Sequence, residues 1–192
     1  MIGAPPRSSN FRKHTSGNPV QRALLARFHA QVGELVGEVF HIQAGCLRSQ
    51  DVLEVGCGEG FVARALDLPT IGLDRRPEAR PAVLADAARL PIRDKAVPIV
   101  LCLEVLEHLP EPWIALEEMR RVCSGYLILS VPDQPWFSLG NLLRGKNLSR
   151  LGEDPEHLWH WRGETFLRLL RERCEVVRTV RSFPWVIALA KA

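Results

Sequence analysis

The sequence contains no apolar run long enough to cross a membrane, and its amino terminus, MIGAPPRSSNFRKH, lacks the apolar centre of a secretory signal. Only five of the 192 residues are cysteines, at positions 46, 57, 102, 123 and 174. Their odd number and their scatter argue against a disulfide framework, and no pair has the CxxC spacing of a zinc site. We therefore expect a cytoplasmic protein with reduced thiols and no transmembrane segment.

A large excess of charge of one sign is also missing. Lys and Arg number 25 against 22 Asp and Glu, a formal net charge of +3. Proteins that bind nucleic acid concentrate basic residues on one face, and this mild excess does not predict such a face. The length and the 46% hydrophobic content suit one domain with a substantial core. We expect a flexible arm over residues 1–17 and a single domain over residues 18–192.

Helical and strand patterns alternate along this domain. Asn18 and Pro19 are typical of a helix start, and apolar residues at three- and four-residue steps from Val20 to Val39 predict a helix within residues 18–45. Pro98 interrupts one apolar segment, so its paired part should begin just after that proline. The alternation indicates an α/β fold whose largely parallel sheet has helices on both faces. Strands are predicted at 51–55, 70–74, 82–85, 97–103, 126–131, 174–183 and 185–190, and further helices follow residue 60 and cover 112–122 and 163–173.

A glycine-rich turn, GCGEG, joins the first strand to the next helix. Gly56, Gly58 and Gly60 allow a tight reversal and let a ligand lie against the backbone, beside a helix N-terminus that favours a carboxylate. An ordinary turn could carry the same glycines, but Glu54 lies inside the strand, where a purely structural strand would prefer an apolar residue. Asp74 ends the second strand, 20 positions after Glu54, where a carboxylate can accept both ribose hydroxyls of an adenosine.

Dinucleotide binding is the main alternative for such a turn. Its fingerprint requires glycine at position 61 for close helix packing, and this chain has Phe61. Asp86 ends the third strand within reach of an adenine amine. Only 11 residues separate Asp74 from Asp86, too few for a full crossover helix, so we expect at most one helical turn between those strands.

The stretches LEVGCGEG, IGLD, ADAARLPI, LCLEVLEHL and LILSVP, in this order over about residues 50–135, resemble the class I methyltransferases of the type 11 group. The resemblance implies a Rossmann-like sheet of seven strands with an antiparallel last strand. It also implies S-adenosylmethionine as cofactor, lying across the carboxyl ends of the first and fourth strands. The implied contacts are Glu54, Gly56 and Gly58 with the methionine portion, Cys57 exposed in the turn, Asp74 with the ribose, Asp86 and Ala87 with the adenine, and Leu103 and Glu104 beside the sulfonium.

In-line methyl transfer requires the protein to align donor and acceptor and to exclude water. We expect the acceptor over the ends of the fourth and fifth strands, where residues 132–162 form an insert. Its apolar start, from Trp136 to Leu143, is followed by Arg144, Lys146 and Arg150. The insert is predicted to be a lid helix, or a surface for a greasy acceptor or a membrane. The NPPY-like motif of base-amine methyltransferases is missing, so we expect a small or lipid-like acceptor and no nucleic acid.

His108 is the predicted catalytic base, although the EHL tripeptide also occurs where it only caps a turn. His157 and His160 lie in a Trp-rich loop and are expected to pack as part of a lid. Glu104, Glu107 and His108 form an ExxEH cluster that some related methyltransferases use for a divalent ion, with His157 as a further ligand. Because the same string occurs without metal, we assign no metal site from sequence. Two alternatives remain open: a non-catalytic module with this fold, and a metal-assisted O-methyltransferase acting on a catechol or diol.

Overall fold

The computed structural model describes residues 18–42, 51–68, 70–143, 145 and 147–192. The proposed arm over residues 1–17 and the last part of the helix predicted to residue 45 lie outside these residues. The helices and strands of the described part are α2 (Pro19–Ile42), β1 (Val52–Val55), α3 (Phe61–Leu66), β2 (Ile71–Asp74), β3 (Val83–Leu84), β4 (Val97–Leu103), α4 (Pro112–Val122), β5 (Cys123–Pro132), α5 (Trp136–Leu143), α6 (Gly163–Arg171), β6 (Glu175–Ser182) and β7 (Trp185–Lys191). Short 3₁₀ helices occur at η1 (Pro77–Ala79), η2 (Leu106–His108) and η3 (Leu148–Arg150).

The seven strands form one sheet in the order β3-β2-β1-β4-β5-β7-β6. Strands β1 to β5 run parallel, and β7 is antiparallel to both of its neighbours. This sheet confirms the predicted Rossmann-like fold with an antiparallel last strand. Because β7 runs the other way, its first residue, Trp185, lies opposite Pro132 at the edge where β5 ends.

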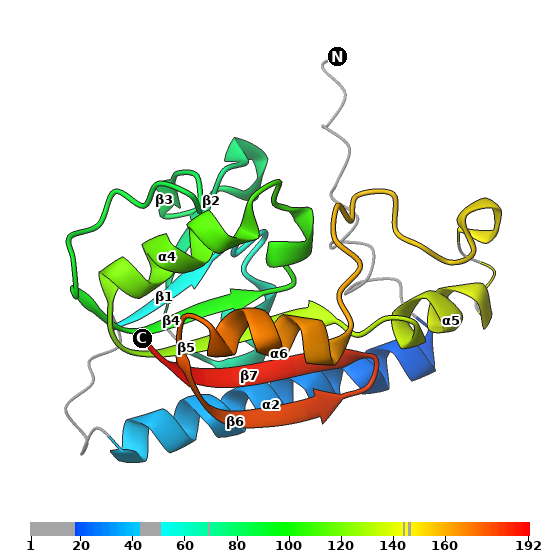
Figure 1. Ribbon diagram of the computed structural model, residues 1–192, viewed down its shortest axis with the longest axis horizontal. Helices are drawn as coiled ribbons and strands as arrows, with labels where there is room; N and C mark the ends of the chain where they lie inside the picture. The colour runs from blue at the N-terminus through cyan, green and yellow to red at the C-terminus, as the bar shows by residue number, and fades with distance from the viewer. Residues whose placement is uncertain (1–17, 43–50, 69, 144, 146) are drawn as a thin grey trace.

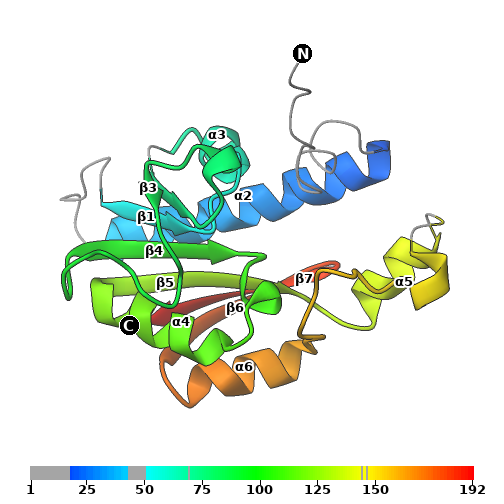
Figure 2. The same ribbon diagram turned by 90° about the horizontal axis from the view of Figure 1, so that it is seen from above.

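Helices cover both faces of the sheet, as Figures 1 and 2 show. Helix α2 packs Phe28, Val32 and Leu35 on one face, against strand residues such as Ile99 and Leu101. Helices α4 and α6 pack on the other face. There Met119 and Phe166 belong to the same apolar cluster as Val100, which lies between Ile99 and Leu101 in the sequence. The two-residue alternation along β4 assigns these side chains to opposite layers. The sheet is therefore held between two apolar layers, and its carboxyl edge is left for a site.

Two local predictions are confirmed. The backbone N–H of Gln21 donates to Asn18 Oδ1 at 2.8 Å, so Asn18 caps α2. Between β2 and β3 the only helical segment is the single turn η1, which agrees with the short spacing from Asp74 to Asp86. Strand β3 itself is shorter than predicted, with two residues.

Pairing in β4 was predicted to start just after Pro98, at Ile99, but it starts two residues earlier. Val97 already pairs with Cys123, and the register shifts at Pro98 before Ile99 pairs with Tyr126. Proline has no N–H to donate, so the ladder accommodates it in an irregularity instead of beginning after it. Strand β5 also starts three residues earlier than predicted, because it follows α4 directly. Among the described residues no helix is both long and apolar enough to span a bilayer.

Candidate active site

The glycine turn lies at the carboxyl edge of the sheet. The backbone N–H groups of Gly56 and Cys57 donate to the carbonyl of Leu73 at 2.7 and 3.0 Å, which ties the turn to β2. Gly56 has a φ of +74° and Gly58 a φ of +52°, a region that residues with a side chain enter at a cost. At Gly56 a Cβ atom would also overlap the side chain of Val105. Position 56 therefore needs glycine both for its backbone conformation and for the close approach of Val105, in the segment that follows β4.

Asp74 is the end of β2 and is held by four donors. The Gly58 N–H donates to Oδ2 at 2.9 Å, and the Arg76 N–H donates to Oδ1 at 2.9 Å. The Arg76 side chain adds longer bonds, from Nε at 3.2 Å and Nη2 at 3.4 Å. Burial by itself raises the pKa of Asp74, but these bonds outweigh it and hold the pKa below its ordinary value. A carboxylate has about four acceptor positions, so a ribose at Asp74 must displace the Arg76 side chain.

Glu54 is almost fully buried within β1, with 3% of its surface exposed. Burial raises the pKa of its carboxyl group to about 7, opposed by the hydrogen bond that Thr70 donates to it at 3.4 Å. A cationic group placed beside it, such as the ammonium of an amino acid, would favour the ionised form. Glu54 is therefore a carboxylate suited to bind a cation at the bottom of the site.

The resemblance implied that Cys57 is exposed in the turn, and this was wrong. Cys57 is half-buried, and its Sγ packs against Gly72, so close that a Cβ on residue 72 would lie only 2.8 Å from it. Burial and the nearby carboxylates of Glu54 and Asp74 raise the pKa of the thiol to about 12, so it stays protonated and unreactive. The side chain turns inward because Gly72 leaves room for it.

Two cavities adjoin at this edge, and every predicted cofactor residue lines one or both of them. The smaller, of about 480 Å³, is lined by Asp74, Asp86 and Ala87. The larger, of about 690 Å³, is lined by the remaining cofactor residues: Glu54, Gly56, Cys57, Gly58, Leu103 and Glu104. Residues that line both cavities are Gly56, Glu104, His108, Pro155 and Glu156. The structure thus brings together residues that are far apart in the sequence.

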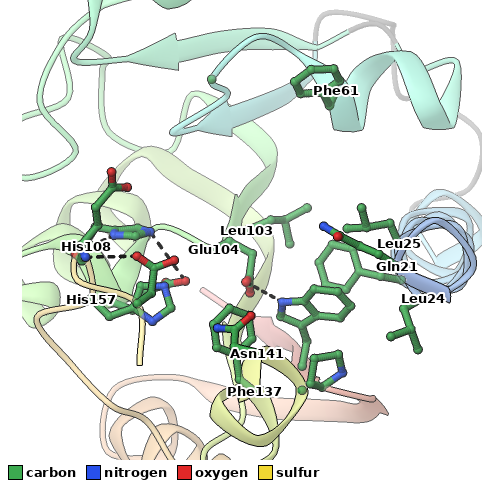
Figure 3. Close-up of a pocket in the computed structure, with 18 of the residues that line it drawn as sticks. Gln21, Leu24, Leu25, Phe61, Leu103, Glu104, His108, Phe137, Asn141 and His157 are labelled. Carbon is green, nitrogen blue, oxygen red and sulfur yellow. Dashed lines mark hydrogen bonds and ion pairs between the residues drawn. The ribbon is translucent and has the colours of Figure 1, made fainter. Parts of the chain in front are cut away.

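The larger cavity extends well beyond the glycine turn. Figure 3 shows Gln21, Leu24 and Leu25 of α2 on one side and Phe137 and Asn141 of α5 on another. The turn between β6 and β7 adds a third wall. The sequence analysis placed the insert at the acceptor site, and α5 does line this cavity. Its walls are largely apolar, so they suit a ligand with an apolar body.

Glu104 lies at the junction of the two cavities, in the left-handed region with a φ of +59°. Its carboxylate accepts hydrogen bonds from Trp185 Nε1 and from the Ser130 hydroxyl. These bonds direct it toward β5 and β7 and away from Glu107. The sequence analysis had grouped Glu104 with Glu107 and His108, and the structure separates it from them.

The possible metal ligands that do lie together are Glu107, His108 and His157, whose ligand atoms are all within 4.8 Å of one another. His108 Nδ1 lies 2.9 Å from the carbonyl oxygen of Glu156, which can only accept, so Nδ1 carries a proton. The other ring nitrogen, Nε2, lies 4.0 Å from Glu107 Oε1. Nε2 is thus the nitrogen of His108 that can exchange a proton or bind an ion in the cavity.

The loop that carries His157 is anchored to η2. The carbonyl of Glu107 accepts from the N–H groups of Leu158 and Trp159 at 2.8 and 3.1 Å. His157 is nearly buried beside Phe137, which agrees with the predicted lid packing. His160 instead pairs with Glu153 at 3.5 Å, outside the cluster.

Sequence reasoning missed several cavity residues. Trp185 was treated as part of a closing strand, although the antiparallel direction of β7 is the signal that would place its first residue at this edge. Gln21 and His29 were passed over because only the apolar face of α2 was considered, yet both line the larger cavity. Arg76 was missed as well, and its position two residues after a ribose-binding carboxylate was the available signal.

The fold and the site define the class. A seven-stranded sheet of this order, with a glycine turn after β1 and a carboxylate after β2, is the Rossmann-like fold of class I methyltransferases. Residues 53–129 match the type 11 family, described as a methyltransferase domain. The matched stretch, 77 of the 192 residues, runs from β1 into β5 and is similar to the methyltransferase domain of that family.

Similar proteins agree with this resemblance. A probable S-adenosylmethionine-dependent methyltransferase of Mycobacterium tuberculosis is 36% identical over 107 residues, which cover 48% of this chain and 39% of that protein. The match thus spans about two fifths of the relative's length. The crystal structure of a magnesium protoporphyrin IX methyltransferase of Synechocystis with bound S-adenosylhomocysteine superposes with a TM-score of 0.64 and 20% identity, covering 96% and 95% of the two chains. A methyltransferase structure from Aquifex aeolicus gives a TM-score of 0.59 and 20% identity, covering 83% and 88%.

Proposed function

We propose that this protein transfers a methyl group from S-adenosylmethionine to an acceptor with an apolar body, either a small molecule or a lipid-like one. One observation carries the proposal: the residues suited to the cofactor line two adjoining cavities, and the larger of these continues into a largely apolar space between α2, α5 and the β6–β7 turn. A donor and an acceptor can therefore meet near Glu104, where the cavities join.

The residues fit the cofactor from end to end. The smaller cavity offers Asp74 to the ribose and Asp86 to the adenine amine, and Gly56 and Gly58 line the adjoining cavities with backbone that carries no side chain. Glu54, with its raised pKa, suits the ammonium of the methionine portion. When bound, S-adenosylmethionine supplies an electrophilic methyl group on a cationic sulfur, and the carboxylate of Glu104 suits that charge.

His108 is the residue proposed to take a proton from the acceptor. It lines both cavities, and its hydrogen bond to Glu156 fixes which nitrogen is the base. Glu107, fully buried beside it, favours the imidazolium that forms. A base is needed when the acceptor atom must lose a proton for methyl transfer, as a hydroxyl or an ammonium group must, so His108 would act on acceptors of these two kinds.

Calorimetry with the cofactor and its product tests the donor side. We expect S-adenosylmethionine and S-adenosylhomocysteine to bind in the micromolar range, roughly 8 kcal/mol. Absence of heat with both ligands would refute the cofactor assignment. Label transfer tests the acceptor side: the protein is incubated with a cell extract and donor carrying a labelled methyl group, and the products are partitioned between organic and aqueous phases. We expect label in the organic phase. Binding without any transfer would favour a non-catalytic module, and label confined to the aqueous phase would refute the apolar acceptor.

The Glu107–His108–His157 group favours a second candidate, metal-assisted methylation of a catechol or diol hydroxyl. Two imidazoles and one carboxylate form a donor set for a borderline divalent ion, which would lower the pKa of a bound hydroxyl. The test is titration of the chelator-treated protein with Mn²⁺, Mg²⁺ or Zn²⁺. Saturable binding that is lost in Glu107→Gln supports this candidate, and identical titrations of the two proteins exclude it.

A further inference from the structure

Large apolar side chains that face solvent gather at one end of the molecule. Among the described residues twelve large apolar side chains are exposed, and seven of them belong to this group. We refer to the seven as the apolar rim: Val20, Trp136, Leu139, Leu143, Leu148, Leu151 and Phe183. Single exposed apolar residues are normal on a soluble domain, whereas a contiguous group marks a surface that binds something.

The rim comes from four segments that meet at the carboxyl edge of the sheet. Val20 is in the first turn of α2, three residues lie on α5, Leu148 and Leu151 belong to η3 or follow it, and Phe183 is in the β6–β7 turn. Both ribbon views place the start of α2 and helix α5 at this same end (Figures 1 and 2). Trp136 and Phe183 bring their rings to 6.4 Å. Asn141 Nδ2 donates to the Gly152 carbonyl at 2.8 Å and so ties the segment after η3 to α5.

The rim is also the mouth of the larger cavity. Four of its residues, Val20, Leu139, Leu143 and Phe183, line that cavity while remaining exposed to solvent. Leu143 exposes 81% of its surface and Leu151 exposes 76%. A cavity with largely apolar walls thus opens at a surface where exposed apolar residues gather.

The charge of the same segment has one sign. In the sequence, residues 136–151 carry three cations, Arg144, Lys146 and Arg150, and no Asp or Glu. Tryptophan beside leucines and basic residues is the composition of segments that lie in the headgroup region of a bilayer. Each cation near an anionic surface adds about 1 kcal/mol, roughly fivefold in affinity.

A second copy of the chain fits this surface less well. In a two-fold dimer the same patch meets itself, so the exposed Arg150 of one copy would face a surface of like positive charge on the other. Such an interface would also cover the mouth of the cavity. An anionic lipid surface complements the positive charge of residues 136–151 and leaves the mouth open to molecules that reside in the lipid.

We infer that the apolar rim docks on an anionic bilayer surface, so that the larger cavity opens directly into lipid. Trp136 and Phe183 enter the headgroup region beside the leucines of α5 and η3, and the exposed Arg150 pairs with a lipid phosphate. The inference goes beyond the proposed methyl transfer, because docking requires neither the cofactor nor any reaction.

Sedimentation with lipid vesicles tests the inference. The purified protein is mixed with vesicles of phosphatidylcholine alone or of equimolar phosphatidylcholine and phosphatidylglycerol. We expect it to pellet with the anionic vesicles, far less with the neutral ones, and less as salt rises. The double variant Trp136→Ser, Leu151→Ser changes two rim residues that do not line the cavity. It should weaken vesicle binding at least tenfold, because each substitution removes apolar surface that docking would bury in the lipid.

Matched variants separate the rim from general surface properties. Ile114→Ser changes an exposed apolar residue on α4, and Arg171→Gln removes an exposed cation at the end of α6. Both should bind vesicles as the parent does, whereas Arg150→Gln should bind about fivefold more weakly. Circular dichroism of every variant checks that it is folded.

Two outcomes would overturn the inference. One is equal vesicle binding by the rim variants and the matched variants, or no binding by the parent. The other is a parent dimer that Leu143→Ser dissociates, with no vesicle binding, which would assign the rim to a second copy. Calorimetry with S-adenosylhomocysteine on the same samples keeps the two proposals apart, because vesicle binding without ligand binding defeats only the methyltransferase function, and the reverse result defeats only the docking.

Discussion

Replacing Gly56 by alanine tests how the glycine turn is built. At a φ of +74° an alanine pays about 1–2 kcal/mol for the left-handed conformation. Its Cβ would also overlap Val105, whose two γ carbons are the nearest atoms, and such overpacking costs about 1–3 kcal/mol. We therefore expect Gly56→Ala to lower the free energy of unfolding by about 2–5 kcal/mol.

Gly58 provides the matched control. It has a similar positive φ, of +52°, but the atom nearest to an added Cβ is Arg76 Nη2 at 3.6 Å, an ordinary contact. Gly58→Ala should therefore pay the conformational cost alone. The difference between the two variants measures the overlap with Val105, and Val105→Ala placed in the Gly56→Ala protein should recover most of that difference.

Denaturant unfolding of the four proteins gives the free energies, and calorimetry with S-adenosylhomocysteine gives the effect on the donor site. Val105 lies between Glu104 and η2, so pushing it away should also displace Glu104 and weaken the donor. Equal stability of Gly56→Ala and Gly58→Ala would refute the reasoning. So would a Val105→Ala substitution that recovers nothing, because the cost would then lie in the backbone alone.

Four further expectations follow from the site. Asp74→Ala should weaken the binding of S-adenosylhomocysteine by about 3 kcal/mol, because it removes two charge-assisted hydrogen bonds to the ribose. An unchanged affinity in calorimetry would show that Asp74 does not bind the ribose. Arg76→Ala should raise the affinity for S-adenosylhomocysteine, because it frees two acceptor positions on Asp74. A lower affinity would show that the arginine aids binding. The folded pKa of Glu54, about 7 against an ordinary 4.5, means that the native state holds the extra proton between these values. Stability should therefore fall as pH rises from 4.5 to about 7, by at most about 1.4 kcal/mol per pH unit, and urea melts of Glu54→Gln should lack that contribution. Replacing Trp136 and Leu143 by Ser should leave donor affinity within about threefold, under about 1 kcal/mol, while acceptor turnover falls; a collapse of donor affinity would assign the insert to the cofactor.

The donor side of the site could be predicted because its residues end parallel strands. The carboxyl ends of β1, β2 and β4 meet at one edge, and the register pairs Val55 with Leu73 and Glu54 with Leu101. A residue that follows any of these strands must then lie near the others. Short apolar segments and a glycine turn are enough to locate such ends in the sequence, and Asp74 was located this way.

Side-chain directions in turns could not be predicted in the same way. The ExxE spacing suggests that Glu104 and Glu107 share a face, as they would on a helix. The positive φ of Glu104 reverses the chain between them, and bonds from Ser130 and Trp185 hold Glu104 on the other side. Cys57 turned inward for a similar reason, because the space above Gly72 is visible only once β1 and β2 are paired. Both outcomes depend on partners distant in sequence.

The loop after η3 joins the donor and acceptor sides physically. Pro155 and Glu156 line both cavities, and the carbonyl of Glu156 holds His108. Further along the loop, the N–H groups of Leu158 and Trp159 donate to the carbonyl of Glu107 in η2. A ligand that moves this loop therefore acts on both cavities at once. By linkage, any gain in acceptor affinity caused by the donor must equal the gain in donor affinity caused by the acceptor. The specificity of the acceptor site consequently cannot be assigned to α5 alone, because Pro155, Glu156 and His108 line the cofactor cavity as well.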